Sequence, residues 1–420
     1  MKVLWLSNVI FPEASLELKI NAPVVGGWMH SAAIALLESN KEIKLAVVAL
    51  YPGKVLKCIN NYTIQYYLIP TKGDQRYDVI LESYYQRINE EFTPDLVHIH
   101  GTEYPHSLAW IKACGIKKVA VSIQGLVSVY TKYYMGGISQ KEINGSITFR
   151  DFIRNDSLLK QQNKMRQRGR YEYELLKNIN YIIGRTSWDK SNTWAINSDA
   201  SYYLCNETLR GTFYNFEWKF ENCEKHTIFL SQAHYPIKGI HQVINALPIV
   251  LRHFPDTRIY VAGNNFISTS IFTRNGFANY LTGLIKNYGI GDKFIFMGLL
   301  NEEDMAKQYL KANVFVCPSS IENSPNSVGE AQLLGLPCIA SYVGGNMDMI
   351  KDHETGFLYR FEETSLLAMR ICEIFANQNL AEKLSKNSRI IALKRHDKKQ
   401  NAESLNQIYR SILNENTSDL

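Results

Sequence analysis

The chain has 420 residues, of which 45% are hydrophobic and 20% charged, and a formal net charge of +6. This length exceeds one ordinary core and indicates about two domains, and the composition excludes a disordered protein. No apolar run approaches the ~20 residues that span a bilayer, and seven scattered cysteines without a C-x-x-C pair exclude a disulfide framework or a zinc site.

The chain begins with an apolar run, Val3–Leu6, that soon becomes polar at Ser7 and Asn8. A secretory leader would continue into a longer apolar stretch that ends at a cleavage site. We therefore interpret the start as a first strand and expect a cytoplasmic protein. The modest positive charge suits an anionic partner such as a nucleotide, a phospholipid or a polyprenyl phosphate, and we expect no nucleic-acid partner.

The first half repeats one pattern, in which a short apolar or β-branched run is followed by turn residues and then by an amphipathic stretch of helical length. This alternation is typical of a parallel α/β sheet. The predicted strands are Lys2–Ser7, Lys44–Leu50, Thr63–Ile69, Leu96–His100, Lys118–Ile123 and Tyr181–Gly184, and the predicted helices are Trp28–Glu38, Tyr104–Cys114 and Ser187–Ile196.

One further helical stretch, Leu158–Lys177, is polar and strongly basic. Its cations are Lys160, Lys164, Arg166, Arg168 and Arg170. This pattern fits a solvated helix face, and it also fits a surface for anionic lipid or an acidic acceptor. The second interpretation predicts peripheral contact with the inner face of a membrane.

The second half repeats the same alternation and predicts a second doubly wound domain. Its predicted strands are Thr227–Ser231, Arg258–Ala262, Lys293–Phe296, Val314–Cys317 and Pro337–Ser341. The stretch Tyr214–Glu221 follows neither period and is the predicted linker. We therefore expect domains at residues 1–217 and 218–398, with a terminal helix at about 399–413 that packs back on the first domain.

Two carboxylates flank the predicted start of a helix that follows the strand Val314–Cys317. Glu322 lies just before this helix and Glu330 more than one turn inside it, so they face different parts of an extended ligand and do not form an acid/base pair. Plainer interpretations remain: Glu322 could be a favourable charge near a helix start, and Glu330 a surface residue.

The start of that helix has the residues of an anion site. Ser324 suits the cap and Pro325 suits the first turn. We expect the amides of Asn326, Ser327 and Val328 to point outward unpaired, and such amides bind phosphate.

The run Glu322–Ala331, continued by Gly335-Leu336-Pro337, Gly344-Gly345 and Glu354–Leu358, closely resembles the C-terminal signature of the family four retaining glycosyltransferases. The Glu-x7-Glu spacing matches without a gap. The resemblance implies the α/β GT-B fold, in which two Rossmann-like doubly wound domains face each other across a cleft. It also implies that Glu330 hydrogen-bonds the donor ribose and that Glu322 contacts the transferred sugar.

A second match lies upstream, where Ile237-Lys238-Gly239-Ile240 resembles the Lys-Gly segment of the family. The resemblance implies that Lys238 meets the donor diphosphate, and a compact charge suits phosphate oxygens. Taken alone, Lys238 would be a solvated surface residue. The sequence departs from the family at Ser231-Gln232, where Gly-Arg is usual, so the second cation must come from elsewhere or is absent.

Arg185 is a candidate for that second cation, because it follows a predicted strand and the C-terminal edge of an α/β sheet binds ligands. An interface salt bridge is the alternative role for Arg185, and Arg210 is an equal rival. Gly27, in a Gly-Gly pair before the first amphipathic helix, resembles the glycine loop of the family. Gly263 ends a predicted strand that flanks the nucleotide in the fold.

His100 and Gln124, both in the first half, are predicted to line the cleft or contact the acceptor. His98 and His100 share one strand face, but without a third ligand they predict no metal site, so His100 is the better candidate for the cleft. Gln124 stands where the family often has histidine, which leaves the polar partner of the reacting sugar open.

The motifs together predict a metal-independent, retaining glycosyltransferase of the hexosyltransferase type, without a cofactor. Its donor would be a UDP- or GDP-sugar and its acceptor a glycan or lipid-linked intermediate of surface polysaccharide biosynthesis. The resemblance implies front-face transfer, in which the departing diphosphate takes the proton of the acceptor. Two alternatives remain: a sugar-nucleotide 2-epimerase of the same fold, and a non-catalytic sugar-nucleotide-binding protein.

Overall fold

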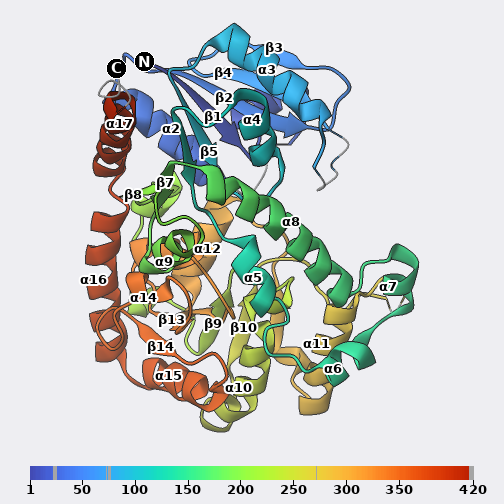
Figure 1. Cartoon of the computed structure of the whole chain (residues 1–420). Helices are drawn as coiled ribbons and strands as arrows, with labels where there is room; N and C mark the ends of the chain where they lie inside the picture. The colour runs from blue at the N-terminus through green and yellow to red at the C-terminus, as the bar shows by residue number, and fades with distance from the viewer. Residues whose placement is uncertain (22–25, 72, 74–76, 271, 416–420) are drawn as a thin grey trace. The chain divides into compact units, whose positions relative to one another are not determined.

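The computed structural model describes residues 1–21, 26–71, 73, 77–270 and 272–415 (Figure 1). The chain forms two compact units. The first contains residues 1–129, 165–209 and the chain from 396 onward, and the second contains residues 130–164 and 210–395.

The first unit is built on a sheet whose described strands run in the order β3-β4-β2-β1-β5-β6-β7-β8 and are parallel except for β3. Inner strands such as β1 are buried along almost their whole length and have a continuous apolar run, Val3–Leu6, because helices cover both faces. The strands are β1 Lys2–Ser7, β2 Lys44–Tyr51, β3 Lys57–Ile59, β4 Gln65–Pro70, β5 Leu96–His100, β6 Val119–Ser122, β7 Tyr181–Gly184 and β8 Ser201–Leu204.

Helices cover both faces of this sheet, and two buried clusters fill the space between them. One cluster includes residues of α2 and α17, and the other includes residues of α3 and α4. The helices of this unit are α1 Pro12–Leu18, α2 Gly27–Ser39, α3 Ile80–Phe92, α4 His106–Cys114, α9 Ser187–Ile196 and α17 Lys398–Glu415, and α5 Val127–Tyr133 and α8 Leu158–Asn178 continue into the other unit.

The C-terminal helix α17 is anchored in the first unit by Tyr409. The hydroxyl of Tyr409 lies 2.9 Å from the Trp5 ring nitrogen and 2.6 Å from His98 Nδ1, and all three side chains are buried. The terminal helix therefore belongs to the unit formed mainly by the N-terminal half.

The second unit is built on a parallel sheet whose described strands run in the order β11-β10-β9-β12-β13-β14. The strands are β9 Thr227–Leu230, β10 Arg258–Val261, β11 Phe294–Phe296, β12 Val314–Cys317, β13 Cys338–Ser341 and β14 Phe357–Tyr359. The helices are α6 Gln140–Ser146, α7 Phe149–Arg154, α10 Ile240–His253, α11 Gly276–Tyr288, α12 Glu302–Lys311, α13 Asn326–Leu334, α14 Asn346–Met349, α15 Thr364–Ala376 and α16 Gln378–Arg395, with 3-10 turns η1 Gly211–Tyr214, η2 Phe220–Asn222, η3 Pro236–Lys238 and η4 Gly291–Lys293.

The structure confirms the two doubly wound sheets and every strand predicted from sequence, with ends that move by at most two residues. Three short strands were not predicted. β3 is the antiparallel edge strand, β8 is half exposed and so lacks a clear apolar run, and β14 has only three residues. Short edge strands carry little periodic signal.

The units divide the chain differently from the predicted boundary near Trp218. Trp218 is buried in the second unit, where its backbone N–H donates to Leu334 O (2.7 Å) and its indole N–H donates to Ala312 O (2.8 Å). Residues 130–164, expected in the first domain, cluster with the second unit because α6 packs on α11. Domain membership here depends on contacts between segments far apart in sequence.

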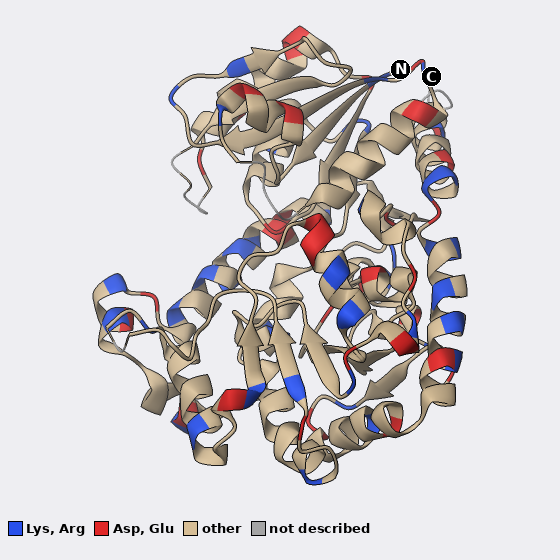
Figure 2. Ribbon diagram, turned by 180° about the vertical axis from the view of Figure 1, so that it is seen from behind, with Lys and Arg blue, Asp and Glu red and all other residues tan. Residues whose placement is uncertain are grey.

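Helix α8 is the basic segment singled out in the sequence, and Figure 2 shows Lys and Arg recurring along it. Lys160, Lys164, Arg166 and Arg170 are exposed, whereas Arg168 is half-buried and lies over the Tyr104 ring, 5.3 Å from its centroid. Within the described ranges, no helix has the length and apolar character needed to cross a membrane.

Candidate functional site

An ion pair at the C-terminal edge of the second sheet joins the two strongest sequence motifs. Lys238 follows β9 and Glu322 follows the neighbouring strand β12, and Lys238 Nζ lies 2.6 Å from Glu322 Oε1. Ser319 Oγ donates to the same carboxylate oxygen at 2.7 Å. Burial alone would lower the pKa of Lys238, but the attraction of Glu322 outweighs it and raises the pKa, so Lys238 stays charged.

Two motif glycines allow these segments to approach so closely. Gly239 has φ +71°, and a Cβ there would clash with the carbonyl oxygen of Pro318 at the end of β12. Gly344 has φ +52°, and a Cβ there would clash with the carbonyl oxygen of Glu322. Any larger residue would push Lys238 or Glu322 out of place, so the glycines are needed for the geometry of the pair.

Helix α13 begins one residue later than predicted. Pro325 takes the cap position, no side chain caps the helix, and Ser324 Oγ contacts Met349 Sδ at 3.7 Å instead. The prediction of a Ser324 cap was therefore wrong. The Val328 amide was also wrongly expected to be unpaired, because it donates to Pro325 O at 3.0 Å. Asn326 and Ser327 form the first turn, next in sequence to the Glu322 loop.

Inside α13, Glu330 is held by an arginine that the sequence offered only as a rival candidate. Arg210 donates Nε to Oε1 at 2.7 Å and an η nitrogen to Oε2 at 2.8 Å, and both side chains are almost fully buried. Burial would lower the pKa of Arg210, but Glu330 outweighs it and raises the pKa. The interpretation of Glu330 as a surface residue is wrong.

Gly263 lies beyond the end of β10, the strand on the other side of β9. Its φ of +122° and a bridge to Gly298 show a backbone position that only glycine adopts readily. A Cβ there would clash with the His234 ring. The predicted donor residues of the second half, Lys238, Glu330, Asn326, Ser327 and Gly263, thus belong to one unit with Glu322.

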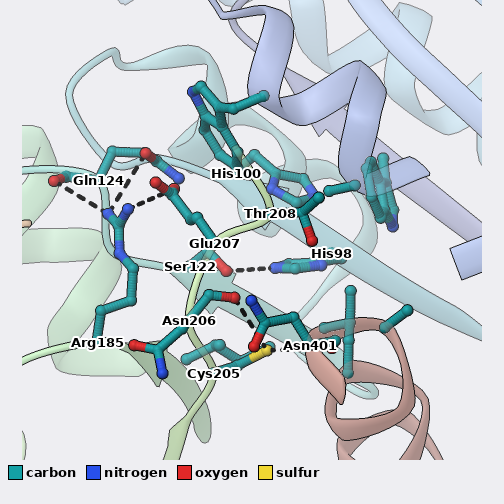
Figure 3. Close-up of a pocket in the computed structure, with 16 residues that line it drawn as sticks. His98, His100, Ser122, Gln124, Arg185, Cys205, Asn206, Glu207, Thr208 and Asn401 are labelled. Carbon is teal, nitrogen blue, oxygen red and sulfur yellow. Dashed lines mark hydrogen bonds and ion pairs between the residues drawn. The ribbon is translucent and has the colours of Figure 1, made fainter. Parts of the chain in front are cut away.

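The first unit holds a separate pocket at its own strand ends (Figure 3). Arg185 lies here. It pairs with Glu207, and an η nitrogen donates to the Gln124 backbone oxygen at 3.2 Å. Arg185 therefore forms a salt bridge within the first unit, whereas the sequence left open one at an interface, and Arg185 belongs to a different unit from Lys238.

His100 lines the same pocket and is 4% exposed. Its ring contacts that of His98 at an angle of 35°, with centroids 3.9 Å apart, and neither ring nitrogen has a hydrogen-bond partner among the described residues. Burial, then His98 and Arg185, lower its pKa well below the ordinary value, so His100 is neutral. His100 and Gln124 therefore line one pocket of the first unit. In the described parts of the chain, no cluster of metal ligands was found.

The predicted glycine loop opens α2. Gly26 caps the helix with φ +83°, and a Cβ there would lie 3.0 Å from one Val9 methyl group and clash with the other. Gly27 is the first helical residue. Glycine is therefore needed at the first position of the Gly-Gly pair, because φ is positive there and Val9, in the loop after β1, leaves no room for a side chain.

Glu103 is a half-buried acid with a buried Oε2, and sequence reasoning missed it. A Cβ on Gly101 would clash with Glu103 Oε2 and lie 2.9 Å from Asn8 Nδ2 and 3.3 Å from Gln124 Cγ, so these side chains surround one point beyond β5. Glu103 Oε2 has no partner within the described structure. Burial, together with Glu172, raises the pKa of Glu103 to about 7 against the pull of Arg185 and Arg168. The sequence carried no periodic signal for it.

We expect Glu103→Gln to stabilise the protein at pH 8 but not at pH 4. A carboxyl whose pKa is raised on folding stabilises the folded state below its unfolded pKa, and this contribution is lost as the pH rises to about 7. Glutamine does not ionise, so the variant should gain roughly 1–3 kcal/mol at the higher pH. Thermal unfolding of both proteins at the two pH values measures this, and an equal difference at both would contradict it.

Comparison with known proteins bears on the second unit most directly. The family model described as Glycosyl transferases group 1 matches residues 214–390. YtcC of Bacillus subtilis, named as a glycosyltransferase, is 30% identical over 192 residues, which cover 45% of this chain and 46% of YtcC. An Escherichia coli UDP-Gal:α-D-GlcNAc-diphosphoundecaprenol α-1,3-galactosyltransferase is 31% identical over 26% of this chain and 29% of its own. The matches thus span less than half of each relative.

Solved structures resemble the whole chain. Sucrose-phosphate synthase from Thermosynechococcus elongatus superposes with a TM-score of 0.71 and 17% identity over 98% of this chain and 99% of its own. Anabaena HepE in complex with UDP-glucose gives 0.64 and 15% identity over 100% of both chains. At these identities the likeness shows the fold, which is GT-B, and the predicted resemblance is confirmed at the level of group 1.

Proposed function

Because residues 214–390 match the family model described as Glycosyl transferases group 1, we propose that this protein transfers a sugar from a nucleoside-diphosphate donor to a glycan or lipid-linked acceptor, with retention at the anomeric carbon. The contact of Lys238 with Glu322 carries the proposal. It brings a cation suited to a diphosphate and a carboxylate suited to sugar hydroxyls to one sheet edge.

In this proposal the donor diphosphate lies beside Lys238. The ammonium group has three N–H donors, so it can bind phosphate oxygens while it keeps its contact with Glu322. As the bond to the anomeric carbon breaks, negative charge grows on the diphosphate, and Lys238 and the first turn of α13 stabilise it. The acceptor hydroxyl attacks from the same face and its proton passes to the departing phosphate. Lys238 supplies positive charge at the point where other enzymes use a divalent cation.

Glu322 and Glu330 would bind the two sugars of the donor. Ser319 and Lys238 both contact Oε1 of Glu322, and Oε2 can accept hydroxyls of the transferred sugar. Arg210 orients Glu330 by two parallel hydrogen bonds, and a carboxylate so held still has lone pairs for the ribose hydroxyls. Arg210 therefore acts as a positioning residue for the ribose contact.

The pocket of the first unit is our proposed acceptor-side site. Neutral His100 and Gln124 offer both donors and acceptors to hydroxyl groups, and Trp28 lines the same pocket with an aromatic surface. The E. coli relative named for transfer to a diphosphoundecaprenol-linked sugar supports a lipid-linked acceptor. HepE in complex with UDP-glucose supports a sugar nucleotide as donor.

The first test is a thermal-shift panel of UDP, GDP, ADP and CMP, followed by their common sugars. We expect one nucleoside diphosphate to raise the melting temperature, since binding to the folded state stabilises it. Lys238→Met should weaken that ligand about 10- to 100-fold, because the phosphate loses its cation while the side-chain volume is kept.

The exposed Lys307→Met variant is the matched control and should respond like the wild type. An unchanged shift in Lys238→Met would refute the placement of the diphosphate. A normal shift without turnover of any nucleotide sugar would favour the non-catalytic alternative.

A further inference from the structure

The short helix α7 in the second unit exposes its apolar side chains and buries its acidic one. Successive helical residues turn by 100°, so Phe149, Phe152 and Ile153 share one face and Asp151 lies opposite. The three apolar side chains are 70%, 81% and 66% exposed, whereas Asp151 is 2% exposed. An ordinary surface helix would bury the apolar face instead.

The contacts of Asp151 explain this orientation. Its carboxylate accepts from the Thr148 backbone N–H at 3.2 Å, while its own N–H bonds to Thr148 Oγ1 at 3.2 Å, which forms a capping box. A Cβ on Gly276 would lie 2.8 Å from Asp151 Oδ2, so the acid also sits against the start of α11. A carboxylate there is favoured by the helix dipole. The inner face of α7 is thus fixed by polar bonds, and its apolar face is left to solvent.

Cations without carboxylate partners occur on α7 and on the two helices next to it in sequence, α6 and α8. Lys141, Arg154 and Lys160 are exposed and form no ion pair within the described residues. The acids of the same segment are already engaged: Glu142 caps Ser139, Asp151 is bonded as above, and Asp156 lies 3.6 Å from Lys164 and 3.7 Å from Arg150. Figure 2 shows Lys and Arg on α7 and along α8.

From this arrangement we propose that α7 inserts Phe149, Phe152 and Ile153 into the interface of an anionic lipid membrane. The apolar tip enters the boundary between headgroups and acyl chains, and Lys141, Arg154 and Lys160 bind lipid phosphates. α7 lies at the rim of its unit, beside α6 (Figure 1). This inference goes beyond the proposed sugar transfer and does not depend on it.

The size of the patch favours lipid over a protein partner. An aromatic side chain buries about 150–250 Å², so three large apolar side chains supply roughly 500 Å². A stable protein interface needs about 800 Å² from each partner. A lipid interface has no such threshold, because binding there grows with each apolar side chain and each cation.

Vesicle sedimentation of the full chain tests the insertion. We expect the wild type to bind vesicles of phosphatidylcholine mixed with phosphatidylglycerol, and the Phe149→Ser/Phe152→Ser variant to bind at least about tenfold more weakly. Trp194→Ser is the matched control, because it removes an aromatic side chain that is 67% exposed in the other unit, and it should bind like the wild type. Equal loss in the control, or no binding by the wild type, would overturn the proposal.

A set of charge-reversal variants tests whether binding depends on anionic lipid. Arg154→Glu/Lys160→Glu should abolish the preference for phosphatidylglycerol, whereas the exposed Lys386→Glu on α16 should keep it. Equal binding of the wild type to phosphatidylcholine alone would overturn the electrostatic part. An unchanged melting temperature in each variant shows that the fold is intact, as expected for exposed positions. Release of nucleoside diphosphate from a donor sugar by the same variants shows separately whether the proposed function holds.

Discussion

Replacement of Glu322 by glutamine is expected to reduce turnover of the donor sugar by about 100- to 1000-fold. The amide keeps the size of the side chain and can still accept from Ser319, so the loop stays in place. It loses the charge that holds Lys238 2.6 Å away and that binds the hydroxyls of the transferred sugar. The measurement is the rate at which nucleoside diphosphate is released from the sugar nucleotide found in the thermal-shift panel. It needs no knowledge of the acceptor.

Two results accompany that loss if the assignment is right. Binding of the free nucleoside diphosphate should change far less than turnover, because Glu322 contacts the sugar in our proposal and Lys238 contacts the phosphate. Glu303→Gln, an exposed carboxylate in α12, should leave the rate unchanged. A rate for Glu322→Gln within threefold of the wild type would show that this carboxylate has no part in transfer.

The second large effect concerns the pair of Arg210 and Glu330. Glu330→Gln should destabilise the second unit by about 3–5 kcal/mol, because Arg210 then stays buried and charged without its carboxylate. At this domain size such a loss lowers the melting temperature by roughly 10 °C. Calorimetry or circular dichroism of the free protein measures it.

A double-mutant cycle separates the pair from its surroundings. Arg210→Met alone should cost a similar amount, since it leaves Glu330 buried without a partner. The double variant Arg210→Met/Glu330→Gln should recover at least half of the summed cost, because neither charge is then left alone. Strict additivity would show that the two side chains do not depend on each other. Because Glu330 contacts the ribose in our proposal, every variant that lacks its carboxylate should also bind the donor more weakly.

Much of the fold was available from the sequence, because strands and helices follow the local period of apolar residues. Leu96–His100, Tyr181–Gly184 and Val314–Cys317 were predicted to the residue. Errors fell where the local pattern is weak or misleading. Ser324-Pro325 looks like a capped helix start, yet the cap position is taken by Pro325 and the helix begins at Asn326. The two units divide between residues 209 and 210, before the expected boundary near Trp218, because Trp218, in an irregular stretch, is buried by segments distant in sequence.

The candidate site shows the same limit. The motif spacing singled out Lys238, Glu322 and Glu330. The glycines of these motifs let the backbone segments approach closely, which explains why the motifs contain glycine. The sequence could not say that Arg210 and not Arg185 would join Glu330, since these partners are 120 residues apart and meet only in the folded unit. Glu103 was missed because its raised pKa comes from burial beside Glu172, and neither feature leaves a trace in the local pattern.

By itself, the sequence determined the succession of strands and helices, the two doubly wound sheets and the motif that we propose binds the donor, because each depends on residues near one another in the chain. Tertiary structure alone decided which charges pair, which unit holds residues 130–164, and that Asp151 lies inward on α7 while its phenylalanines face solvent. The free energy of a buried charge or an exposed apolar side chain depends on its surroundings, and distant segments supply those surroundings only after the chain has folded.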